Sequence, residues 1–172
     1  MVALVVEDGT GLPTANSFLT IAEADDILSV NPRSLWPLVS PTDKSNLLIW
    51  ATRMIVERTK WRGYKRYDNS GLPWPRERVI GRETSLYNYG YLDNASVPFQ
   101  VKEATAYLAE FLSQTDPTTV NSSSNIKEIE VDVVKLKFDP ALRPARWPVT
   151  IRIALAPIGT FSPGGSRQIV KC

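Results

Sequence analysis

The sequence contains no histidine and only one cysteine, Cys172. Without histidine, the chain lacks the usual general base, the Ser-His and Cys-His nucleophile systems and imidazole metal ligands. A lone cysteine can form no disulfide within the chain and no cysteine-based metal cluster. The glycine-rich stretch SPGGS at residues 162–166 is not followed by Lys-Ser or Lys-Thr, so it fails as a phosphate-binding loop. We therefore expect neither enzymatic activity nor a cofactor.

Long apolar runs are also missing. No stretch of 18 apolar residues exists, and the opening MVALVVEDGTG has no basic region before its short apolar run. We expect no membrane span, no secretory signal and a protein that stays in the cytoplasm where it is made. The 172 residues are 43% hydrophobic, which is enough for one globular core and little for two.

The net charge of +2 conceals a strong asymmetry along the chain. Residues 58–82 carry eight cations against two carboxylates, a net charge of +6, which leaves −4 for the rest. Acidic residues gather near the start, where Glu23, Asp25 and Asp26 follow one another closely. These three could bind a hard cation, but such a group at the start of a helix is more simply a solvated first turn facing the helix dipole.

Two helices are predicted by their capping residues. Thr20 and Glu23 have the spacing of a capping box, which indicates a helix that starts at residue 21 and ends near residue 30. Ser40 is followed by proline and then by an acid, which indicates a second helix over residues 41–61.

A third helix is predicted over residues 98–112, where apolar side chains repeat every three to four positions. Apolar residues alternate over residues 129–138 with a one-residue change of phase, as at a β-bulge or where a strand changes partner. Residues 149–155 fit a strand or a short helix equally well.

The predicted fold is mainly α, a small helical bundle with a proline-rich loop and a β-containing extended C-terminal segment. We divide it into a helical domain with an N-terminal arm, residues 1–115, and a linker, strand segment and docking tail, residues 116–172.

Residues 72–79 read LPWPRERV. The two prolines remove backbone donors and favour extended conformations, which excludes a helix or an inner strand. The result is a stiff loop. It either places Trp74 in the protein's own core or presents it, with Arg76 and Arg78, to a partner.

Aromatic and basic residues alternate just before this loop, where Trp61, Tyr64 and Tyr67 stand among five cations. These cations are Arg58, Lys60, Arg62, Lys65 and Arg66. The mixture is typical of a groove for single-stranded nucleic acid, in which aromatics stack on bases and cations neutralise phosphates. In the alternative interpretation the aromatics complete the core and the cations coat the end of a helix.

A protein acidic in one part and basic in another also suits head-to-tail contacts that close into a ring. The C-terminal peptide follows a glycine hinge and could add a strand to the sheet edge of a partner, although a frayed terminus is the simpler alternative. Its residues are Arg167, Gln168, Ile169, Val170 and Lys171.

Four segments resemble the tailed-bacteriophage head–tail connector family, some of whose members carry a DnaT-like single-stranded-DNA-binding label. They are VEDGTGLPTANSFLTIAEADDIL, WRGYK, GLPWPRERV and VPFQVKEATAYLAEFL, and the similarity covers about residues 4–113. The resemblance implies a mainly helical adaptor that assembles as a ring, usually of twelve copies, beneath the portal. Its partners would be the portal protein, other copies of itself, tail or nozzle proteins, and double-stranded DNA passing non-specifically through the channel.

The same resemblance implies roles for individual residues. Residues 167–171 would dock onto the portal or a neighbour, and Trp74 would anchor the stiff loop. The residues at a subunit interface or the channel would be Arg62, Lys65, Arg66, Trp74, Arg76, Arg78 and Arg82. The protein would reside at the head–tail interface of the virion, after assembly in the host cytoplasm. The alternative is a DnaT-like replication accessory protein that binds single-stranded DNA through Trp61, Tyr64 and the cations that flank them.

Overall fold

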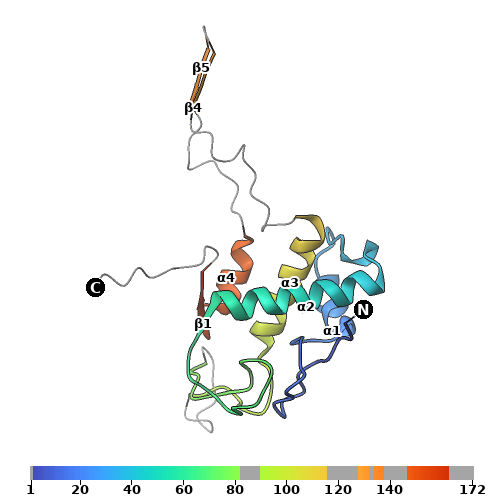
Figure 1. Ribbon diagram of the computed structural model, residues 1–172, viewed down its shortest axis with the longest axis vertical. Helices are drawn as coiled ribbons and strands as arrows, with labels where there is room; N and C mark the ends of the chain where they lie inside the picture. The colour runs from blue at the N-terminus through green and yellow to red at the C-terminus, as the bar shows by residue number, and fades with distance from the viewer. Residues whose placement is uncertain (1, 82–89, 116–127, 132–133, 138–146, 163–172) are drawn as a thin grey trace, which may run out of the picture.

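The computed structural model describes residues 2–81, 90–115, 128–131, 134–137 and 147–162. Within these ranges the chain forms four α-helices, one 3₁₀ helix and six short strands (Figure 1). In chain order they are α1 (Ile21–Ser29), η1 (Trp36–Leu38), α2 (Pro41–Arg58), β1 (Thr59–Trp61), β2 (Tyr64–Lys65), β3 (Arg76–Glu77), α3 (Phe99–Gln114), β4 (Glu128–Val131), β5 (Val134–Lys137), α4 (Val149–Leu155) and β6 (Gly159–Phe161). The fold is therefore a small domain of helices with short antiparallel strand pairs.

The helices pack on one another, and the loops gather at one end of them. Helix α2 packs across α3, and α4 lies against α3 on the side near β1 (Figure 1). The strands pair antiparallel as β1 with β6, β2 with β3 and β4 with β5. The basic segment begins at the C-terminal end of α2 and contains β1, β2 and β3. We call this part of the molecule, residues 59–81, the loop end.

The capping predictions for α1 and α2 are confirmed. The Thr20 hydroxyl accepts from the Glu23 amide while the Glu23 carboxylate accepts from the Thr20 amide, a complete capping box. The Ser40 hydroxyl accepts from the Asp43 amide at the start of α2. Helix α2 ends at Arg58, three residues before the predicted end, because the next residues form β1 and take their hydrogen bonds from β6.

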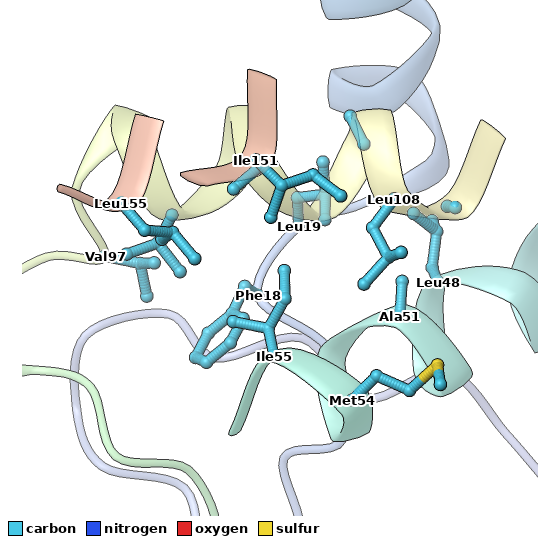
Figure 2. Close-up of a cluster of buried hydrophobic side chains, with 14 of the residues drawn as sticks. Phe18, Leu19, Leu48, Ala51, Met54, Ile55, Val97, Leu108, Ile151 and Leu155 are labelled. Atoms are coloured by element: carbon cyan, nitrogen blue, oxygen red, sulfur yellow. The ribbon is translucent and has the colours of Figure 1, made fainter. Parts of the chain in front are cut away.

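The core is a single cluster to which all four α-helices contribute (Figure 2). Phe18, Ile55, Leu108, Ile151 and Leu155 are among its completely buried members. The predicted apolar stripe of the third helix is confirmed, since it forms the buried face of α3. Burial of this face stabilises the helices more than their intrinsic propensities do.

The structure bears on two points that the sequence left open in the C-terminal part. Residues 149–155, for which the sequence pattern left two alternatives, are helical and begin after Pro148. Within residues 129–138, β4 pairs antiparallel with β5 in a register that joins Val131 to Val134. The predicted change of phase at Val133–Val134 includes a residue outside the described part of the chain. Since α4 and β6 contribute to the same core as the earlier helices, the core extends beyond residue 115. The division into residues 1–115 and 116–172 stays a prediction.

Candidate nucleic-acid interface

The proline-rich loop directs Trp74 into the core. Trp74 is completely buried, and its ring meets that of Trp61 edge to face at 5.8 Å between centroids. Trp61 in turn meets Phe18 edge to face at 6.4 Å, and its indole nitrogen is buried. The Trp74–Pro75 peptide bond is cis. Trp61 is therefore partly buried and packs against the aromatic core. Its role in base stacking, part of the single-strand alternative, stays a prediction.

Arg76 holds this loop against the turn that joins β1 to β2. Its guanidinium donates to the carbonyl oxygens of Arg62 at 2.7 Å, Gly63 at 2.7 Å and Pro73 at 3.2 Å. Burial lowers the pKa of Arg76 from its ordinary value. Because three carbonyls occupy its donors, Arg76 acts as a structural clamp that fixes the neighbouring surface.

Other cations of the segment also bind within the chain. Lys65 donates to the Ser70 carbonyl oxygen at 2.6 Å, and Arg66 donates to the Asn94 carbonyl oxygen at 2.6 Å. The Arg66 guanidinium also lies over the Tyr67 ring, 5.2 Å from its centroid. Arg58 lies over the Trp147 ring at 5.1 Å. These three residues are positively charged and only partly buried, but their side chains already make contacts within the chain.

The exposed cations and aromatics of the segment are Lys60, Arg62, Tyr64 and Arg78, and its carboxylates Asp68 and Glu77 are also exposed. The Tyr64 side chain is 68% exposed, and Tyr64 pairs with Glu77 across β2 and β3, directly beside Arg78. Of the predicted site residues, Arg82 and residues 167–171 lie outside the described part of the chain.

A groove of about 440 Å³ adjoins this surface. It is lined by Arg62, Ile80, Gly81, Ile153, Ala156 and Pro157. Ile80 and Ile153 are 64% and 61% exposed, which is high for isoleucine. Arg62 is anchored here, because its guanidinium donates to the Pro157 carbonyl oxygen at 2.9 Å.

A second hollow, between η1, α2 and the end of α3, has a different character. Its lining contains Asp43 and no lysine or arginine. A polyanion would gain nothing there from charge, so the basic loop end is the better candidate surface.

Two of the acidic residues near the start, Glu23 and Asp25, make contacts between helices, and Asp26 is exposed. Asp25 accepts from the Trp36 indole and from the Lys44 ammonium, each at 2.7 Å. Glu23 accepts from Lys102 of α3 at 2.5 Å.

Within the described ranges, no group of three or more His, Cys, Asp or Glu side chains could hold a metal ion. Across the same ranges, no helix has the length and apolar character needed to cross a membrane.

Sequence reasoning missed the apolar side of this surface. Ile153 lies on a segment that the sequence left undecided, and Ile80 follows the proline-rich loop without any periodic pattern. A helical reading of residues 149–155 would have placed Val149 and Ile153 one turn apart on one face, and both are exposed.

Comparison with known proteins gives one match. The model of a family described as "Putative DnaT-like ssDNA binding protein" matches residues 2–170. No curated protein matches this chain, and no solved structure does.

This match corrects the main prediction from the sequence. The description names single-stranded DNA binding, and nothing in the comparisons supports a head–tail connector, a portal-binding ring of twelve copies or a channel for double-stranded DNA. The prediction of a structural adaptor joining portal to tail is therefore wrong, and the alternative is the better supported interpretation. The roles given to individual residues at a subunit interface, a channel or a portal lose their basis with it.

Proposed function

Since the chain belongs to the DnaT-like single-stranded-DNA-binding family, we propose that it binds single-stranded DNA, with the exposed side chains of the β1–β3 loop end as its contact surface. The observation that carries this proposal is the family match over residues 2–170. It acts as a binding protein with no catalytic step, in keeping with the absence of histidine and the lone cysteine.

The geometry supports this surface over others on the molecule. Tyr64 offers an exposed ring, and stacking on such a ring tolerates any base because every base has a π-face. Three exposed cations can neutralise phosphates near this ring. Lys60 and Arg62 are close to Tyr64 in the sequence, and Arg78 follows Glu77, the residue that pairs with Tyr64. The hydrogen bonds of Arg76 fix the turn that carries Arg62 and Gly63. This turn therefore loses less conformational entropy when DNA binds.

The first test measures binding of a labelled oligothymidine by fluorescence anisotropy over a range of salt concentrations. Tyr64→Ala is expected to weaken binding by about 1–3 kcal/mol, because it removes one stacking platform. Tyr64→Phe is the matched control, since it keeps the ring and should keep the affinity. Glu77→Gln removes the carboxylate across from Tyr64 and is expected to tighten binding.

Charge is tested by the salt dependence. Lys60→Gln should reduce the slope of log affinity against log salt by about 0.7, the value for one phosphate contact on a single strand. Arg33→Gln removes another exposed cation, from the loop after α1, and should leave the slope unchanged. A wild-type protein that does not bind oligothymidine at low salt would refute the proposed function, and a Tyr64→Ala variant with wild-type affinity would refute the proposed surface.

A further inference from the structure

The groove beside Arg62 is assembled from three segments that are distant in the sequence. Arg62 follows β1, Ile80 and Gly81 follow β3, and the remaining wall comes from the C-terminal half of α4 and the residues after it. Its volume of about 440 Å³ is within the range of small-ligand sites, roughly 300–1,000 Å³. Its position next to the exposed cations makes it continuous with the proposed DNA surface.

The lining combines one cation with apolar walls and contains no carboxylate. The Arg62 guanidinium is held on one edge by the Pro157 carbonyl oxygen, and such an in-plane hydrogen bond leaves the faces of the guanidinium free. Planar guanidinium groups stack well on the faces of nucleobases. Gly81 has no side chain, which lets a ligand approach the backbone closely.

We propose that this groove holds one unstacked base of the bound strand, with the Arg62 guanidinium against the base and Ile80 and Ile153 as its apolar walls. The inference rests on the proposed function and adds a base-binding site to it. A base is the component of single-stranded DNA that matches an apolar wall, because a phosphate in this groove would leave both isoleucines without a partner. The apolar walls offer little hydrogen bonding to base edges, so the site should accept different bases.

The test compares two ligands of equal length, oligothymidine and an oligomer of abasic residues that has the same phosphates but no bases. Ile153→Ala is expected to weaken binding of oligothymidine about fivefold, from the loss of apolar contact area, and to leave binding of the abasic oligomer unchanged. Arg62→Lys keeps the charge but loses the planar group, so it should show the same selective loss.

Val149→Ala is the matched control, since Val149 is an exposed residue one turn earlier on α4 and does not line the groove. Thermal unfolding of each variant checks that the fold is intact. Because Ile153 is exposed, its truncation should not lower the melting temperature.

The outcomes separate this inference from the proposed function. If the wild-type protein binds neither oligomer, the proposed function fails. If it binds oligothymidine but Ile153→Ala binds it equally well, the function stands and the base site is refuted. Equal losses of affinity for both oligomers would assign the groove to the DNA backbone and overturn the inference. A variant that loses a protein partner but keeps its DNA affinity would make the groove a protein-docking site and would also overturn it.

Discussion

Arg78 combines an unusual backbone conformation with an exposed charge. Its φ is 56°, and it is the one non-glycine residue with positive φ in the described part of the chain. This conformation costs a residue with a Cβ about 1–2 kcal/mol. Its side chain is exposed while the next residue, Val79, is buried. The strain thus keeps a cation at the surface between a buried valine and the tyrosine-bearing strand pair.

Replacement of Arg78 by asparagine separates binding from stability. Asparagine tolerates positive φ better than arginine does, so Arg78→Asn should leave the free energy of unfolding unchanged or raise it by about 0.5 kcal/mol. The affinity for oligothymidine should fall because a phosphate-neutralising charge is lost. Urea unfolding and anisotropy measure the two effects. A variant that is less stable, or that binds as tightly as wild type, would contradict this prediction.

At the level of elements, the turn between β1 and β2 depends on Gly63. Its φ is 66°, and a Cβ added there would lie 2.2 Å from the Glu77 carbonyl oxygen. That oxygen belongs to the backbone of β3 and cannot move without disturbing the strand pair. Gly63→Ala should therefore lower the free energy of unfolding by more than about 2 kcal/mol in a urea titration. Asn69→Ala, an exposed change in the same loop region, is the control and should have little effect.

The contact between α1 and α3 should make stability depend on pH. Burial raises the pKa of Glu23, but hydrogen bonds from Lys102 and the Thr20 amide outweigh it, so the net pKa lies below the ordinary value of 4.5. A carboxyl with a lowered pKa in the folded state contributes stability above about pH 4.5, and this contribution is lost as the pH falls through the lower folded value.

Glu23→Gln should keep the capping geometry and lose the ion pair. We expect a reduction of about 0.5–1 kcal/mol at neutral pH and a flatter decline in stability below pH 4.5, measured by thermal unfolding across the acid range. Glu57→Gln breaks the exposed pair with Arg53 on one helix and should change neither quantity appreciably. Equal acid sensitivity in wild type and Glu23→Gln would show that the ion pair is not responsible.

For the whole molecule, the features that the sequence predicted are those encoded locally. Capping at Thr20 and Ser40 and the buried stripe of α3 depend on residues within a few positions of one another, and all three are confirmed. The pairing of β1 with β6 joins residues about 100 positions apart, and no local pattern indicates it. This explains the misplaced end of α2.

The candidate surface was predictable in part. Composition located the basic segment, but it could not tell that Lys65, Arg66 and Arg76 are partly buried against carbonyl oxygens. Nor could it tell that Arg62 stays exposed while it donates to the Pro157 carbonyl oxygen. Spacing likewise could not decide between a buried and a presented Trp74, because two prolines stiffen a loop without setting the direction of the side chain between them. Side-chain direction in an irregular loop depends on tertiary packing.

The β1–β6 pair has a consequence for the order of events on the ribosome. During synthesis, Thr59–Trp61 emerges well before Gly159–Phe161, the segment that completes its ladder. At about 5–20 residues per second, the intervening stretch of about 100 residues takes roughly 5–20 s to make. For that interval the nascent chain presents an unpaired strand edge with a tryptophan at its end, a period in which a chaperone or a neighbouring nascent chain could occupy the edge before its own partner arrives.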